Sequence, residues 1–153
     1  MYKFPISVML ESFRESTDNA IKSAVRVGAQ SIQMYATQDE HAPENMNARA
    51  RRDLLNKLKD NGLKFSALCG DLGRHFDRPE TNPDTIERSK RILDTALELE
   101  TNIVTTHIGV IPADDTTPPG YKIMQDTCRT LAEFADSLKA HFAIKTGPEP
   151  ANS

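Results

Sequence analysis

Polar side chains that can transfer protons or hydrogen-bond a small ligand occur at five places in this chain, each at or just after the end of a short apolar segment. They are Glu11, Tyr35, Asp71 with His75, His107, and Lys145. Carboxylates, imidazoles and lysine amines often act as general acids and bases in enzymes. The pattern therefore predicts one site for a small polar molecule, with His107 and Lys145 as candidate catalytic residues. The other four are candidate substrate-binding residues.

Each candidate also has a structural role that the sequence leaves open. Glu11 could hydrogen-bond a substrate hydroxyl, or it could pair with Lys145 or Arg14 across the strand ends. Asp71 could cap its own turn through its side chain, and His75 could be a solvated loop residue. His107 could be hydrogen-bonded within the strand end. Lys145 could act as a general base or Schiff-base lysine, or it could be a substitution that neutralises the site.

The apolar segments before these side chains have the length and composition of β-strands, and amphipathic segments with helical spacing separate them. The predicted strands are residues 4–10, 31–35, 64–69, 102–107 and 141–145. The predicted helices are residues 17–27, 48–61, 82–99 and 121–138. The chain thus consists of about four and a half β/α units, and we predict a single domain over residues 1–153.

Particular residue types mark the ends of these helices. Gly28 and Gly62 follow the first two helices, as expected where the chain takes a positive φ past a helix end. Glu100 and Lys139 occupy the corresponding turns after the last two helices, where a positive φ costs a non-glycine residue about 1 kcal/mol. Asn82, which is followed by proline, is expected to be the N-cap of the third helix.

Strands that alternate with helices of this length form a parallel sheet through right-handed crossovers. Two α/β architectures meet this pattern: a doubly wound open sheet and part of a (β/α)8 TIM barrel. Both place functional residues at the carboxyl ends of the strands, where the polar side chains of this chain occur. Residues 10–14, after the first strand, contain no glycine. Their composition argues against the glycine-rich phosphate loop of dinucleotide-binding and P-loop proteins.

Composition places the chain among ordinary globular proteins, with 38% hydrophobic and 27% charged residues in a length that suits one domain. The net charge is −3 and the 19 basic residues are scattered, so we expect no nucleic-acid partner. The sequence has neither an apolar run of the roughly 20 residues that a membrane span needs nor a signal segment, so we expect no membrane association. Cys69 and Cys128 are expected to be free thiols in a reducing, cytoplasmic compartment.

Four short motifs together resemble the sugar phosphate isomerase/epimerase family. They are Ile-Ser-Val-Met-Leu-Glu at 6–11, Cys-Gly-Asp-Leu-Gly at 69–73, Val-Thr-Thr-His-Ile-Gly at 104–109 and Thr-Gly-Pro-Glu-Pro at 146–150. The resemblance covers nearly the whole chain but only the N-terminal half of a family member. It implies a xylose-isomerase-like TIM barrel, related to the family 2 AP endonucleases. It also implies proton transfer on a small sugar or sugar phosphate, and a divalent metal such as manganese, magnesium or zinc.

Lys145 departs from the pattern of that family. The family typically has a glutamate before Thr-Gly-Pro-Glu-Pro, where it binds the metal beside the transferred proton. A lysine ammonium has no lone pair for a metal and repels it, and the remaining family ligands belong to strands six to eight. We therefore assign no metal-ligating residue and expect metal binding to be weak or absent. The resemblance implies an isomerase or epimerase that is inactive or incomplete as this chain alone; the alternative is a non-catalytic sugar-binding or assembly module.

A half barrel leaves one face of its sheet and two strand edges uncovered, which favours association. We expect a symmetric homodimer through this open face, rather than loops folded over the sheet or an aggregating fragment. The expectation depends on apolar side chains that we place on both faces of the strands. They are Val8, Leu10, Ile32, Met34, Leu68, Val104 and Ile144.

Overall fold

The computed structural model describes residues 4–37, 39–112 and 119–145; the motif at 146–150 lies outside this part of the chain. The strands are β1 (Ser7–Met9), β2 (Ser31–Tyr35), β3 (Lys64–Cys69), β4 (Ile103–His107) and β5 (His141–Lys145). The helices are α1 (Thr17–Arg26), α2 (Ala48–Asp60), α3 (Asn82–Glu98) and α4 (Gly120–Ser137), with short 3-10 turns η1 (Leu10–Phe13) and η2 (Asp39–His41). The predicted order of strands and helices is confirmed. β1 is shorter than predicted because the chain turns into η1 at Leu10.

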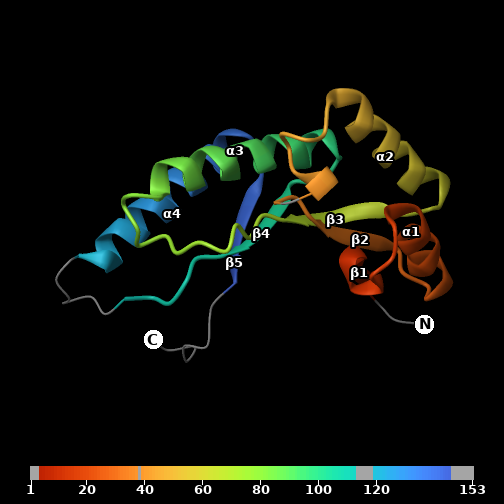
Figure 1. Ribbon diagram of the computed structural model, residues 1–153, viewed down its shortest axis with the longest axis horizontal. Helices are drawn as coiled ribbons and strands as arrows, with labels where there is room; N and C mark the ends of the chain where they lie inside the picture. The colour runs from red at the N-terminus through yellow and green to blue at the C-terminus, as the bar shows by residue number, and fades with distance from the viewer. Residues whose placement is uncertain (1–3, 38, 113–118, 146–153) are drawn as a thin grey trace.

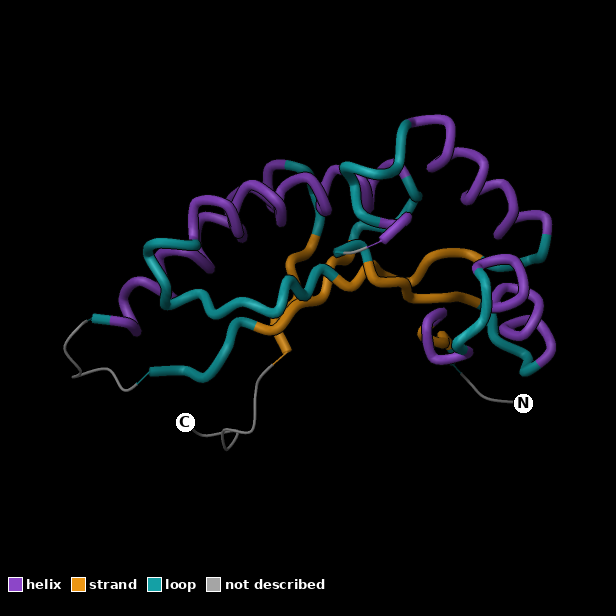
Figure 2. Tube along the Cα trace, in the orientation of Figure 1, coloured by secondary structure: helices purple, strands orange, loops and turns teal. Residues whose placement is uncertain are grey.

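The strands form one parallel sheet in the order β1-β2-β3-β4-β5. Figure 1 shows the labelled helices on one side of this sheet, and the tube in Figure 2 shows none of the four α-helices on the opposite side. A doubly wound sheet reverses its strand order and carries helices on both faces. The sequential order and the single helical layer are instead those of a partial (β/α)8 barrel, which confirms the barrel interpretation.

One face of the sheet is buried beneath the helices. Ile32, Met34, Leu68 and Val104 have no exposed surface and share one core cluster with helix side chains. Strand pairing aligns Val8 with Ile32, and Leu68 with both Met34 and Val104. These side chains therefore all project toward the helices, and the prediction that the apolar residues line both faces is wrong. The helix side chains in this cluster are Ala20, Ile21, Ala24, Leu54, Leu55, Leu58, Ile92, Leu93 and Ala96.

The uncovered face of the sheet is polar. Successive residues of a strand point to opposite faces, so Gln33 and Tyr35 of β2 and Thr105 and His107 of β4 project away from the helices. Gln33 Nε2 donates a hydrogen bond of 2.6 Å to Thr105 Oγ1, which links β2 to β4 across the intervening strand. The open face is therefore a hydrogen-bonded surface rather than a second hydrophobic core.

Asn82 has a different role from the predicted one. α3 begins at Asn82, and Thr81 precedes it as the N-cap residue. The buried Asn82 side chain donates through Nδ2 to the Phe76 carbonyl and to Thr127 Oγ1, both at 2.7 Å. Asn82 therefore joins the loop after β3 to α4, and so helps to hold the loop that carries Asp71.

The residues that follow the four helices have the positive φ that the sequence predicts, whether or not they are glycines. Gly28 and Gly62 have φ of +79° and +70°, and Glu100 and Lys139 have φ of +57° and +55° at the equivalent turns. Glu100 and Lys139 therefore have a strained backbone conformation. Among the described helices, none has the length and apolar character needed to cross a membrane.

Replacing Lys139 with glycine is expected to stabilise the fold by about 0.5–1 kcal/mol, because glycine takes a positive φ without a clash at Cβ. The Lys139 side chain is exposed, so little packing is lost. Urea denaturation of the two proteins measures the difference. Lys22→Gly, at an exposed position inside α1, is the matched control and should destabilise by about 1 kcal/mol. An unfolding midpoint for Lys139→Gly at or below that of the natural chain would contradict the prediction.

Candidate functional site

The carboxyl ends of the strands surround a cavity of about 300 Å³. Every strand of the described sheet contributes to its wall. The lining residues are Met9 from β1, Gln33 and Tyr35 from β2, Cys69 from β3, Thr105, Thr106 and His107 from β4, and Lys145 from β5. Three of the predicted site residues, Tyr35, His107 and Lys145, are thus brought together at one place.

Asp71 holds the imidazole of His107 in position. Asp71 Oδ2 lies 2.8 Å from His107 Nδ1, and Asp71 Oδ1 accepts a hydrogen bond of 2.9 Å from the Gly73 backbone N–H. The second contact is the side-chain turn that the sequence left open for Asp71. A carboxylate that accepts the Nδ1–H fixes the ring orientation and leaves Nε2 as the other available nitrogen. Asp71 therefore acts at the cavity through His107, without lining the cavity itself.

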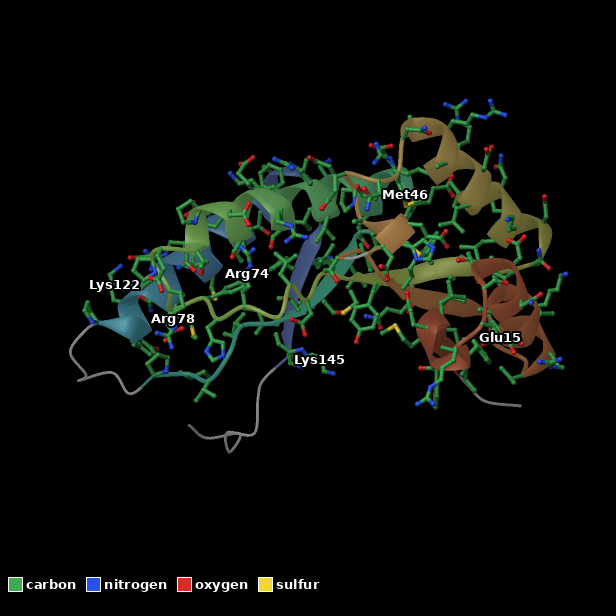
Figure 3. All side chains as sticks on the ribbon, viewed as in Figure 1. Glu15, Met46, Arg74, Arg78, Lys122 and Lys145 are labelled. Carbon is green, nitrogen blue, oxygen red and sulfur yellow. The ribbon has the colours of Figure 1, made fainter. Side chains whose placement is uncertain are left out.

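Lys145 lies beside His107 because the two residues are partners in the β4–β5 pairing. Figure 3 shows Lys145 at the lower end of β5, on the side of the sheet away from the helices. Its side chain takes part in none of the ion pairs within the described ranges. The pairing with Glu11 that the sequence left open is therefore not formed.

Glu11 connects the end of β1 to the end of β2. Its Oε1 accepts a hydrogen bond of 2.9 Å from the backbone N–H of Tyr35. Its Oε2 is buried and has no hydrogen-bond partner in the part of the chain that the structure describes. Glu11 lies behind the cavity wall and positions Tyr35, so its contact with a substrate stays a prediction.

Tyr35 and Cys69 are strand partners in the cavity wall. The neighbouring Cys69, burial, and the carboxylates of Asp71 and Glu11 raise the pKa of the Tyr35 phenol. Burial raises the pKa of the Cys69 thiol. Both groups therefore keep their protons at neutral pH, and they present an O–H and an S–H to a ligand.

His75 does not join the cavity. Its ring lies against Gly109, where an added Cβ would come within 2.7 Å of two ring atoms. Its Nδ1 lies 3.8 Å from Asp77 Oδ1, in the loop after β3. The structure thus separates His75 from His107, and its role in substrate binding stays a prediction.

Sequence reasoning missed five residues of the cavity wall: Met9, Gln33, Cys69, Thr105 and Thr106. Gln33 and Thr105 each stand two positions before a predicted site residue of the same strand, which places them on the same face. That spacing is the signal that could have identified them. Cys69 ends its strand, as Tyr35 and His107 do, but its thiol was interpreted only as a sign of the redox compartment.

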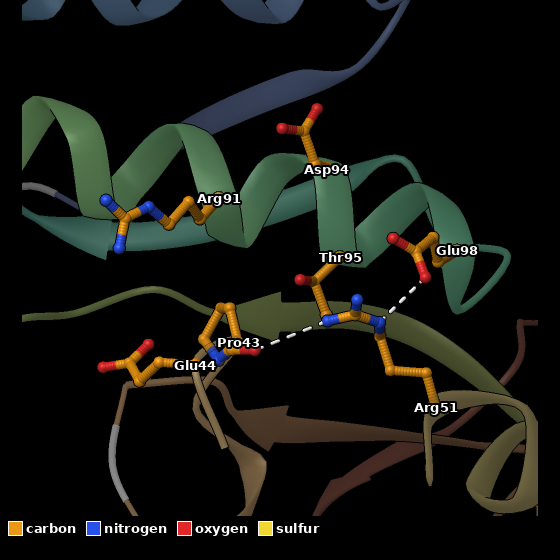
Figure 4. Close-up of a pocket in the computed structure, with 7 residues that line it drawn as sticks. All are labelled: Pro43, Glu44, Arg51, Arg91, Asp94, Thr95 and Glu98. Carbon is orange, nitrogen blue, oxygen red and sulfur yellow. Dashed lines mark hydrogen bonds and ion pairs between the residues drawn. The ribbon is translucent and has the colours of Figure 1, made fainter. Parts of the chain in front are cut away.

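A second cavity of about 290 Å³ lies in the helical layer between α2 and α3, and Figure 4 shows its lining residues. Arg51 crosses it, donating to Glu98 Oε2 at 2.8 Å and to the Pro43 carbonyl at 3.5 Å. The guanidinium is thus paired within the protein. This cavity contains none of the predicted site residues, whereas the strand ends bring three of them together and are therefore the candidate functional site.

Residues 21–152 match the protein family described as xylose isomerase-like TIM barrel, which is also named for AP endonuclease family 2. The chain belongs to this family. None of the curated proteins compared with the chain is a significant match.

Several solved structures have a similar fold. A xylose isomerase domain protein from Planctomyces limnophilus gives a TM-score of 0.80 at 17% identity, over 99% of this chain and 58% of that chain. The probable 3-DHS dehydratase AsbF from Bacillus anthracis gives 0.74 at 20% identity, over 95% and 53% of the two chains. A D-tagatose 3-epimerase-like protein gives 0.76 at 12% identity, over 97% and 55%. The chain therefore spans about half the length of these structures.

Proposed function

We propose that this chain binds a small sugar or sugar phosphate in the cavity at the carboxyl ends of its strands. We further propose that isomerase or epimerase chemistry by proton transfer there needs additional strands to complete the site. The observation that supports this proposal is that His107, oriented by Asp71, and Lys145 meet in a cavity of about 300 Å³. Hydroxyl, amide and thiol groups line the rest of the wall, and they suit the hydrogen-bonding groups of a polyol.

His107 is the proton acceptor in this proposal. Isomerisation and epimerisation remove a proton from a carbon beside a carbonyl group and return one to the product. Because Asp71 accepts the Nδ1–H, neutral His107 has an unprotonated Nε2 that can take that proton. Lys145, the strand partner of His107, supplies positive charge in the same cavity. If the chain is instead a non-catalytic sugar-binding or assembly module, which is the alternative, the same groups bind a ligand without transferring a proton.

The divalent metal that the family implies does not fit the described residues. No group of three or more His, Cys, Asp or Glu side chains within the described ranges could hold a metal ion. Asp71 and His107 bond to each other, and the next residue along the sheet edge is the cationic Lys145. We infer that this part of the chain binds manganese, magnesium or zinc weakly or not at all.

We also propose that a second copy of the chain covers the open face in a homodimer. Since the exposed strand residues are polar, the driving force is pairing of the unpaired edges of β1 and β5 rather than burial of an apolar face. Ile144 adds one apolar contact at the β5 edge, where 41% of it is exposed, although strand alternation places it on the helix side of the sheet.

Binding of pentoses and their phosphates is expected to perturb the amide NMR signals of Tyr35, Cys69 and His107. His107→Ala should weaken binding at least about tenfold, the loss of one hydrogen bond to a polar ligand. His141→Ala, which changes an exposed histidine at the opposite end of β5, is the control and should bind as the natural chain does. Signals that shift instead around the cavity between α2 and α3 would contradict the proposal.

Replacing Lys145 with glutamate is expected to raise the affinity for Mn²⁺ at least about tenfold in calorimetric titration. The change removes a positive charge and adds a negative one, and each unit interaction with a cation at about 4 Å amounts to about 4 kcal/mol at an effective dielectric near 20. Lys64→Glu, at the opposite end of the sheet, controls for overall charge. Tight binding by the natural chain, or no gain in the variant, would show that Lys145 does not control metal affinity.

Light scattering is expected to give about twice the chain mass of 17.0 kDa at micromolar concentration, from an interface above about 1,000 Å² in total. Ile144→Lys should shift the dimer toward monomer. Val27→Lys, which is also at an exposed apolar residue but at the end of α1, should not. A monodisperse monomer of the natural chain would show the dimer proposal to be wrong.

A further inference from the structure

We propose that the ligand of this cavity carries an anionic group, a carboxylate or a phosphate, and that Lys145 binds it. The inference rests on the proposed function, since it specifies the class of small sugar that the strand ends take. It assigns to Lys145 a role in ligand selection and separates acidic or phosphorylated sugars from neutral ones.

The first argument is the sign of the charge in the cavity. No aspartate or glutamate is among the described side chains that line it, and the lysine ammonium is the charged group that does. His107 is the other lining residue that can carry a charge, and that charge is also positive. The ammonium of Lys145 therefore gives this lining an attraction for anions, which the carboxylates of Asp71 and Glu11 behind the wall oppose, as their effect on the pKa of Tyr35 shows.

The second argument is that, within the described ranges, no acidic side chain pairs with Lys145. Three exposed lysines have such a partner there (Lys57, Lys59 and Lys122), whereas Lys22, Lys64 and Lys139, like Lys145, have none. Lys57 pairs with Asp18, and Lys59 pairs with Glu100. No ion pair within the described ranges includes Lys145, although its strand neighbour His107 contacts Asp71. No carboxylate of the described ranges therefore competes with an anionic ligand for this ammonium.

The third argument is that the nearest carboxylates are already engaged in the wall. Asp71 accepts from Gly73 N–H and contacts His107, and Glu11 accepts from Tyr35 N–H. Each carboxylate thus has at least one partner on the protein side of the cavity, although Glu11 Oε2 has none among the described residues. Tyr35 and Cys69, between them, are neutral donors. The groups that face a ligand are therefore suited to donate hydrogen bonds to an oxyanion.

The experiment compares D-ribose, D-ribonate and D-ribose 5-phosphate, which share a carbon skeleton and differ in charge. Amide NMR titration of the full chain measures the affinity for each compound and shows where on the sheet that compound binds. We expect ribonate, ribose 5-phosphate or both to bind at least about tenfold more tightly than ribose, a difference that falls as salt screens the charge. A preference for one of the two acids identifies the anionic group as carboxylate or phosphate.

Lys145→Met, which keeps the length of the side chain and removes its charge, should abolish that preference, and Lys145→Arg should retain most of it. Lys64→Met, an exposed strand lysine at the amino end of β3, should behave as the natural chain. Equal affinity for all three compounds at the strand ends would overturn this inference and leave the proposed function standing. A preference that survives in Lys145→Met, or that salt does not weaken, would also overturn it. If no compound shifts the signals of Tyr35, Cys69 and His107, the proposed function and this inference both fail.

Discussion

A parallel sheet that is covered on one face only divides the side chains of every strand between two environments, and the rest of this structure depends on that division. Apolar residues of each strand pack beneath the helices, and the residues between them face the open side. Because the strands are parallel, their carboxyl ends lie along one rim of the sheet. The open-side residues at the end of each strand therefore face the same space. Tyr35, Cys69, His107 and Lys145 meet for this reason, although more than 30 residues separate each from the next along the chain.

Hydrogen bonds along this rim determine which charged side chains face the cavity. Asp71 and Glu11 both follow strands and could have faced a ligand. The backbone N–H groups of Gly73 and Tyr35 instead hold them in the wall, because a carboxylate accepts such bonds strongly. Lys145 has no equivalent partner in the described ranges. The chain as a whole carries a net charge of −3, so the presence of a lysine, and of no described carboxylate, in the cavity lining is a local property of these contacts.

Much of the fold could be predicted because its signals are local. Helical spacing, strand length and the glycines after helices are all visible in short windows of sequence. Short windows of sequence do not show which face of the sheet is covered, because that depends on where the four helices pack. For that reason the apolar residues were placed on both faces, and Gln33 and Thr105 were not identified as cavity residues. Asn82 shows the same limit: its position before a proline favours an N-cap, but bonds to Phe76 and to Thr127 of α4 determine its role.

The polar inner face also restricts what can close this half of the barrel. Gln33 and Thr105 already satisfy each other across the sheet, so covering them costs little. Glu11 Oε2 lacks a donor among the described residues, and Lys145 lacks an acidic partner there. Burying such groups without partners costs about 1–3 kcal/mol for each neutral group and more for charged ones. A purely apolar cover would therefore be disfavoured at the rim of the cavity. Strands that complete the barrel need to bring a hydrogen-bond donor to Glu11, while the acceptor for Lys145 comes from those strands or from the ligand itself. Closure of the barrel and recognition of the ligand thus depend on the same two side chains at opposite edges of the sheet.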